Sequence, residues 1–364
     1  MENQNQTPHK RRVRYKGKYP KKFEEKYKEL QPEKYKDTIE HVIQKGNTPA
    51  GMHISIMVKE ILDFLNIQPG ETGFDATLGY GGHTKAMLQC LNGKGHIYAT
   101  DVDPEESAKT KKRLAEQGFG EELLTVKLQN FCTIDEIAKE VGGFDFILAD
   151  LGVSSMQIDN PKRGFSFKTD GPLDLRLNQE TGISAARRLD TISREELAGM
   201  LCENSDEPYC EELAKAITDE IRRGNHIDTT TKLRQVIEKT LDFLPEKEKK
   251  ETIKKTCQRT FQALRIDVNH EFEVLYEFME KLPDALRPGG RVAILTFHSG
   301  EDKLVKKALK AGYKEGIYSD YAKDVIRPSA KECTQNPRAR STKMRWAIKA
   351  CLLYTSDAAD DRIS

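Results

Sequence analysis

The sequence lacks the features of a membrane, secreted or metal-binding protein. No stretch approaches the roughly 18 consecutive apolar residues that a membrane span needs, and the basic start has no signal-peptide core. The seven cysteines include no Cys-x-x-Cys pair and the eight histidines show no ligand spacing, which disfavours a disulfide framework or a zinc site. We therefore expect a soluble, cytoplasmic protein without a bound metal.

Charge is balanced overall but segregated along the chain. The totals are 59 Lys plus Arg and 58 Asp plus Glu, and residues 1–22 hold eight basic side chains and one acidic, which leaves 51 basic and 57 acidic for the rest. Tyr15, Tyr19 and Phe23 lie within or beside this arm. The pattern is typical of a segment that contacts nucleic-acid phosphates, and a solvated tail is an equally good interpretation. Residues 23–44 then predict a short exposed helix.

Short apolar runs alternate with helical stretches from Ile54 onward. This alternation predicts a parallel sheet built from βαβ units. The candidate strands are Thr72–Leu78, His96–Asp101, Leu124–Leu128, Phe144–Ala149, Arg291–Phe297 and Met344–Ile348.

The alternation stops between Leu151 and Glu271, where apolar residues recur at helical spacing and Ser193 with Glu196 predicts a capping box. We therefore expect an α/β fold that is interrupted by a helical insertion. The predicted divisions are a basic extension over 1–47, a sheet domain over 48–155 and 269–350, and an insertion over 156–268 that we expect to recognise RNA. Residues 351–364 resemble translated adaptor sequence and are expected to lie outside the fold.

A glycine-rich loop follows the first predicted strand and precedes a helix. Gly81 and Gly82 allow the backbone to approach a ligand, His83 follows them, and Asp101 ends the second strand, where a carboxylate can accept from ribose hydroxyls. A dinucleotide and S-adenosylmethionine compete for such a site. Asp75 favours S-adenosylmethionine, because a carboxylate would repel a pyrophosphate and attract an ammonium and a sulfonium. His83 as a polar residue of the first helical turn and Asp75 as a loop cap remain alternatives.

Asp150 directly follows the fourth predicted strand, and Gln157 lies seven residues further along the chain. The carboxyl end of a sheet strand is where a substrate meets a cofactor in such folds. Asp150 is therefore a candidate for contact with the reacting atoms, although it could instead cap the next turn.

Several long motifs occur in one order along the chain. They are Asp75–His83, Asp150–Asp159, Arg163–Phe167, Asp170–Arg176, Arg259–Glu271, Phe297–Ser299 and Asn336–Ser341. Together they closely resemble the ribosomal RNA small-subunit methyltransferase H family over about His53 to Ala347. Gly300 and Phe272 depart from this pattern, since the family commonly has Leu at both positions, and we interpret both as packing changes. The basic arm has no counterpart in the common pattern.

The resemblance implies a class I, Rossmann-like methyltransferase that transfers a methyl group from S-adenosylmethionine to the exocyclic N4 of a cytidine in 16S ribosomal RNA. The RNA could be free or part of an assembled small subunit, and a homodimer is one of the oligomeric states left open. Phe131 would stack near the adenine. The cofactor contacts implied are Gly81, Gly82, His83, Asp101, Phe131, Asp150 and Gln157.

The chemistry assigns provisional roles to a few side chains. The N4 amino group is a poor nucleophile, so a hydrogen-bond acceptor for its N–H would help by stabilising the positive charge that develops on the nitrogen. Asp150 is the first candidate for this role, and the alternative is that it only orients the cofactor. Phe165 or Phe167 could stack on an unstacked base, or belong to the core. His298 is expected either to contact RNA or to be structural, and Ser299 with Asp302 to cap the following helix.

Two basic clusters are candidate phosphate contacts, and a solvated helix face is the alternative for the first. They are Lys249, Lys250, Lys254, Lys255, Arg259 and Arg265, and then Arg338, Arg340, Lys343 and Arg345. A non-catalytic RNA-binding ribosome-assembly factor and a Rossmann dehydrogenase remain as competing functions; the glycine loop with Asp150 argues against the first, and Asp75 against the second.

Overall fold

The computed structural model describes residues 55–351 of the chain. The predictions for the basic arm, the helix over 23–44 and the tail after Cys351 lie outside the described residues. Within the described residues, no helix combines the length and the apolar character needed to cross a membrane.

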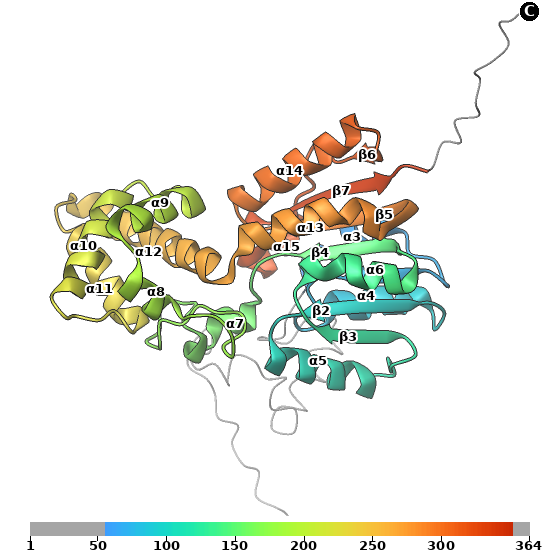
Figure 1. The fold of residues 1–364 in the computed structure, drawn as a ribbon, viewed down its shortest axis with the longest axis horizontal. Coiled ribbons are helices and arrows are strands. Elements are labelled where there is room, and N and C mark those ends of the chain that lie inside the picture. Colours follow the sequence, from blue (N-terminus) through green and yellow to red (C-terminus); the bar gives the residue numbers. More distant parts are fainter. Residues whose placement is uncertain (1–54, 352–364) are drawn as a thin grey trace, which may run out of the picture. The chain divides into compact units, whose positions relative to one another are not determined.

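A seven-stranded sheet forms the core of the protein, in the order β3-β2-β1-β4-β5-β7-β6 (Figure 1). Strands β1 to β5 pair in parallel, and β7 is antiparallel to both of its neighbours. The bounds are β1 Thr72–Asp75, β2 His96–Asp101, β3 Leu124–Leu128, β4 Phe144–Asp150, β5 Leu286–Thr296, β6 Tyr318–Tyr321 and β7 Lys343–Lys349. All six predicted strands are confirmed, and β6 is an addition at the sheet edge.

Strand β5 begins five residues earlier than predicted. Its pairing with β4 sets Phe144 opposite Leu286 and Phe146 opposite Arg291, so the register shifts between the two pairs. Residues 286–290 therefore form an irregular start of the strand, where Gly289 takes a positive φ of 76°.

Helices cover both faces of the sheet. Successive residues of β4 alternate between two apolar cores, with Phe146 and Leu148 in one and Ile147 and Ala149 in the other. The first core includes residues of α3 Val58–Leu65, α4 Gly82–Leu91 and α5 Pro104–Glu116. The second includes residues of α6 Ile134–Val141, α13 Glu271–Ala285 and α14 Ser299–Lys314. The strands are therefore apolar on both sides, as expected of a covered parallel sheet.

The predicted helical insertion is present and has its own apolar core. Short α7 Ser155–Asp159 and the 3₁₀ turn η3 Pro161–Arg163 precede it, and Figure 1 shows the later helices grouped together. Leu197, Leu213, Leu233 and Leu264 are all buried in this core. Its helices are α8 Ala185–Thr191, α9 Arg194–Ser205, α10 Cys210–Arg222, α11 Thr230–Thr240 and α12 Glu246–Asn269. Ser193 caps α9 by accepting from the Glu196 N–H at 3.1 Å, while the Glu196 carboxylate pairs with Arg188.

Asn269 ties the entry and exit of the insertion together. Its Oδ1 accepts from the Leu177 N–H at 2.7 Å, and its Nδ2 donates to the Leu175 carbonyl at 2.8 Å. These bonds hold the chain that enters the insertion against the last turn of α12, directly before α13 returns to the sheet.

Candidate active site

Asp75 fixes the loop between β1 and α4. Its Oδ2 accepts from Thr84 Oγ1 at 2.6 Å and its Oδ1 accepts from the Thr77 N–H at 3.1 Å. Burial raises the pKa of this carboxyl, and the two hydrogen bonds oppose that rise. Asp75 therefore links the end of the strand to the first turn of the helix.

The two glycines of the loop are held where a side chain has no room. Gly81 has φ 76°, and a Cβ there would lie 2.7 Å from Thr110 Cγ2. A Cβ on Gly82 would lie 2.0 Å from Ser55 Oγ. The loop thus runs in close contact with α5 on one side and with Ser55 on the other, and glycine avoids the contacts that a Cβ would make at both positions.

His83, in the first turn of α4, and Asp150, at the end of β4, come together. His83 Nε2 lies 3.3 Å from Asp150 Oδ2, and both side chains are largely buried. Asp150 Oδ1 is also buried and has no hydrogen-bond partner among residues 55–351. Burial opposes protonation of His83, but the Asp150 and Asp75 carboxylates outweigh it and raise the His83 pKa. A buried acceptor without a partner is costly, so this oxygen is suited to a ligand donor.

Asp101 also lies beside the glycine loop. Its Oδ2 accepts from the Gly79 N–H at 2.8 Å, and its Oδ1 accepts from the Asp103 N–H at 2.9 Å. Burial raises the pKa of Asp101 to about 6, against the hydrogen bond from Gly79 and the charge of Arg163. Each carboxylate oxygen can accept a second hydrogen bond, so the group can still take a ligand hydroxyl.

Sequence analysis missed the ion pair between Asp103 and Arg163. Arg163 Nη2 bonds Asp103 Oδ2, and Arg163 Nη1 donates to the Leu177 carbonyl at 3.0 Å. Both side chains are buried. Asp103 caps α5 directly before Pro104, and an Asp before a Pro is a helix-start signal that can be identified from the sequence. Its ion-pair partner lies 60 residues away and cannot be identified in that way. The pair fastens the segment after β4 to the start of α5.

Gln157 and Phe131 each contact other residues of the protein and still offer a group to a ligand. Gln157 Oε1 accepts from the Ser154 N–H at 3.0 Å, and Nε2 donates to Asp103 Oδ2 at 3.2 Å, which leaves one amide N–H. Phe131 begins the 3₁₀ turn after β3 and meets Phe278 edge-on, with ring centroids 5.2 Å apart. Both residues follow the carboxyl ends of strands, Phe131 after β3 and Gln157 after β4.

The structure places the two candidate stacking rings with the insertion core. Phe165 is buried, and Phe167 packs edge-on against Phe261 at 5.9 Å. Of the two alternatives, membership of the apolar core agrees with these contacts.

Some of the side chains expected to contact phosphates instead form ion pairs with acidic residues of the protein. The prediction is wrong for Arg265, which donates to both oxygens of Glu271, and for buried Arg345, which donates to Asp302 at 2.6 Å. Asp302 lies 43 residues before Arg345, so local charge counting could not reveal that pair, whereas Glu271 lies six residues after Arg265. Arg338 likewise reaches Asp159 at 2.8 Å. Exposed Arg340 has no acidic partner among the residues described.

The predicted cap of α14 is also corrected. His298 is the N-cap, and its Nδ1 accepts from the Glu301 N–H while Glu301 accepts from the His298 backbone. Asp302 bonds Lys343 and Arg345 instead of capping with Ser299. Glu271, His298 and Glu301 hold ligand-type atoms within 4.8 Å of one another, but the Arg265 guanidinium already balances Glu271. The structural role of His298 accounts for these contacts.

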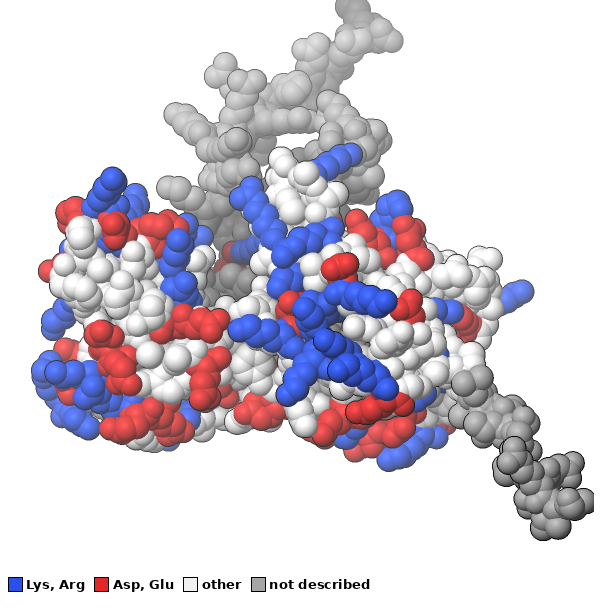
Figure 2. All heavy atoms as spheres, turned by 90° about the horizontal axis from the view of Figure 1, so that it is seen from above, with Lys and Arg blue, Asp and Glu red and all other residues white. Residues whose placement is uncertain are grey.

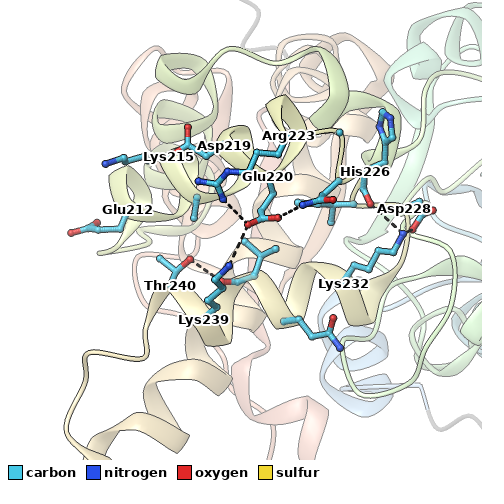
Figure 3. Close-up of a pocket in the computed structure, with 16 residues that line it drawn as sticks. Glu212, Lys215, Asp219, Glu220, Arg223, His226, Asp228, Lys232, Lys239 and Thr240 are labelled. Atoms are coloured by element: carbon cyan, nitrogen blue, oxygen red, sulfur yellow. Dashed lines mark hydrogen bonds and ion pairs between the residues drawn. The ribbon is translucent and has the colours of Figure 1, made fainter.

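A hollow of about 850 Å³ lies elsewhere, between α10 and α11 of the insertion (Figure 3). Figure 3 shows Glu220 at its centre. The Glu220 carboxylate accepts from Arg223 at 3.1 Å, from Asn225 at 2.7 Å and from Lys239 at 3.4 Å. Its lining includes none of the predicted cofactor residues. The candidate site therefore lies at the carboxyl ends of the sheet strands and not in this hollow.

Comparison with known proteins shows the family to which the chain belongs. The MraW methylase family matches residues 50–350. A ribosomal RNA small subunit methyltransferase H 1 of Agathobacter rectalis is 86% identical over 342 residues, which is 94% of this chain and 98% of that protein. A ribosomal RNA small subunit methyltransferase H 2 of Alkaliphilus metalliredigens is 62% identical, covering 93% of this chain and 97% of the relative.

A more distant relative, ribosomal RNA small subunit methyltransferase H of Acidobacterium capsulatum, is 37% identical over 301 residues, or 82% of this chain and 98% of that protein. The predicted Rossmann-like class I methyltransferase fold is confirmed, and the chain belongs to the MraW methylase family.

Proposed function

We propose that this protein methylates the exocyclic N4 of a cytidine in small-subunit ribosomal RNA, with S-adenosylmethionine as the methyl donor. The observation that carries the proposal is the His83–Asp150 pair beside the glycine loop, with a buried Asp150 oxygen that has no partner among the described residues. Relatives named as ribosomal RNA methyltransferases support the choice of substrate. We place the reaction in the cytoplasm, where ribosomal subunits are assembled.

The residues at the sheet edge fit S-adenosylmethionine. Gly81 and Gly82 lie where a Cβ would meet Thr110 and Ser55, and Asp101 keeps acceptor capacity for ribose hydroxyls. Phe131 offers a ring for the adenine, and Gln157 one free amide N–H. Asp75 acts on the loop itself through Thr77 and Thr84. When bound, the cofactor supplies an electrophilic methyl group on a sulfonium.

Asp150 is the residue that we assign to the amino group of the base. The lone pair of the cytosine N4 is delocalised into the ring, which makes the amino group a poor nucleophile. A group that accepts a hydrogen bond from the N4 N–H favours a more pyramidal and more nucleophilic nitrogen. Asp150 Oδ1 can accept that N–H and stabilise the positive charge that develops on N4. Burial opposes protonation of His83, but the Asp150 and Asp75 carboxylates raise its pKa, so a protonated His83 can pair with Asp150 Oδ2, which lies 3.3 Å from Nε2. The proton released from N4 then passes to Asp150 or to solvent.

Methyl transfer to small ribosomal subunits that lack N4-methylcytidine tests this function. Labelled S-adenosylmethionine supplies the methyl group, nucleoside mass spectrometry identifies the product, and S-adenosylhomocysteine binding by calorimetry confirms an intact cofactor site. N4-methylcytidine in the RNA is the expected result. Cofactor binding without any methylated RNA would instead favour the non-catalytic assembly factor.

A further inference from the structure

Helix α14 carries a row of exposed lysines that the sequence analysis did not identify. One face of the helix is buried: Val305 and Leu309 are fully buried, and Gly312 is buried on the same side. Leu309 and Gly312 follow Val305 by four and seven residues, which is helical spacing. The opposite face exposes only one kind of charge. Its members, spaced three or four residues apart, are Lys303, Lys306, Lys307, Lys310 and Lys314, which we name the α14 lysine face.

The two acids of α14 do not neutralise this face. Glu301 is buried and accepts from the Phe297 N–H at 2.8 Å, and Asp302 is buried against Lys343 and Arg345. None of the five lysines has an acidic partner among residues 55–351. Glu315, directly after the helix, is the exposed acid nearest in sequence.

Five other helices arrange lysines differently. Five exposed lysines and the partly buried Lys281 each pair with an acid three or four residues away, which stabilises a helix. These pairs are Lys59–Asp63, Lys109–Glu105, Lys112–Glu116, Lys139–Asp135, Lys232–Asp228 and Lys281–Glu277. In α14 the same spacings bring lysine beside lysine, which destabilises a helix. The α14 lysine face therefore differs from the paired lysines of these five helices.

Figure 2 shows Lys and Arg side chains gathered at the centre of the face on which α14 lies in Figure 1. The helix begins four residues after Leu295, which pairs with Asp150 across β5 and β4. A helix of 16 residues spans about 24 Å. The α14 lysine face thus extends away from the candidate active site over a length that can contact several phosphates.

We propose that the α14 lysine face binds the phosphate backbone of the substrate RNA and guides the target cytidine toward Asp150. The inference rests on the proposed function, which makes RNA the polyanion that reaches this edge of the sheet. Unpaired ammonium groups in a row match a chain of phosphates and carry no base specificity. The face therefore contributes affinity and orientation, not sequence recognition.

The test compares two full-length variants that lose the same number of charges. The first changes Lys303, Lys306, Lys307, Lys310 and Lys314 to Gln, which keeps good helix formers. The matched control changes five exposed, acid-paired lysines to Gln, namely Lys109, Lys111, Lys112, Lys139 and Lys232. Binding to a 16S ribosomal RNA transcript and to assembled small subunits is measured against potassium chloride concentration.

The proposal expects the first variant to bind the transcript at least about 10-fold more weakly near 0.1 M salt, with the slope of log K against log salt reduced by about 2 to 4. The control variant should stay within about 2-fold of the unmodified protein, because its lysines are neutralised by acids. S-adenosylhomocysteine binding should be unchanged in both. If thermal unfolding of the five-residue variant is altered, a Lys306, Lys310 and Lys314 triple variant repeats the measurement.

An unchanged salt slope for the transcript would overturn the proposal. Weakened binding to assembled subunits with unchanged transcript binding would also overturn it, in favour of an acidic protein partner. A reduced slope in a protein that makes no N4-methylcytidine would uphold the RNA surface and refute the proposed function, so the two failures are distinguishable.

Discussion

The ring of Phe272 packs against the backbone of Gly300, so that a Cβ atom on Gly300 would lie 2.5 Å from Phe272 Cζ. Phe272 lies in the first turn of α13 and Gly300 in the first turn of α14. The family that the sequence resembles commonly has Leu at both positions. The two departures are therefore one exchange, in which a larger ring on one helix is accommodated by a missing side chain on the other. Phe272 also meets His298 edge-on at 5.7 Å.

This exchange predicts strong coupling between the two positions. Gly300→Leu should destabilise the protein by about 1–3 kcal/mol through overpacking, and Phe272→Leu should also destabilise it by leaving a cavity. The double variant should be more stable than the sum of the two changes predicts, by at least about 1 kcal/mol. Urea unfolding of the four proteins measures the coupling, and strictly additive free energies would contradict it.

Gly81→Ala should impair the cofactor site more than an equivalent change elsewhere. Gly93, at φ 73°, offers the matched control, because a Cβ there meets nothing within 4 Å, whereas Gly81 at φ 76° would place one against Thr110. Both variants share the backbone strain of a positive φ, of order 1 kcal/mol or more. Calorimetry should show S-adenosylhomocysteine binding lost or weakened at least about 10-fold in Gly81→Ala only. Equal affinities in the two variants would exclude close backbone approach at Gly81.

Cofactor affinity should fall as pH falls through about 6, the pKa to which burial raises Asp101. The folded pKa lies above the ordinary value, so the carboxyl becomes protonated within the range from pH 7 to 5 and loses acceptor capacity for ribose hydroxyls. If only the ionised form binds, affinity at pH 5 is about 10-fold lower than at pH 7. Asp101→Asn should bind more weakly at pH 7 and should lose this component of the pH dependence. Parallel pH profiles for the two proteins would rule out Asp101 as the titrating group.

Removal of Arg163 should destabilise the fold because it leaves Asp103 buried without its cation. Breaking one side of a buried ion pair costs about 3–5 kcal/mol, and we expect Arg163→Met to lie in that range. Asp103→Asn combined with Arg163→Met should recover part of the loss, since the orphaned charge is removed. Chemical denaturation with the single and double variants measures the coupling. A single variant as stable as the parent would show that the pair contributes little.

Local patterns in the sequence predicted the sheet and the loops of the site. Each of the six strands is a short apolar run bounded by turn residues, and the glycine loop and Asp150 directly follow such runs. Strand β6 was missed because it lies at the sheet edge, and only Tyr318 of its four residues is buried. An edge strand needs no apolar alternation, so its sequence carries little signal.

Partners distant in sequence could not be predicted. Arg338 and Asp159 are 179 residues apart and Arg163 and Asp103 are 60 apart, so only the folded chain brings them together. The cap of α14 was misplaced by one residue, because Ser299 is a common capping residue and His298 is not. The contact between Phe272 and Gly300 was likewise invisible, although each departure was noticed separately.

The most direct test of the account is the single-turnover rate of N4-methylcytidine formation by the unmodified protein and by Asp150→Asn, at saturating S-adenosylmethionine and small subunits. The account predicts N4-methylcytidine from the unmodified protein and a rate at least about 100-fold lower for the variant, with S-adenosylhomocysteine affinity changed far less. Equal rates in the two proteins, or bound cofactor without any N4-methylcytidine from the unmodified protein, would contradict it.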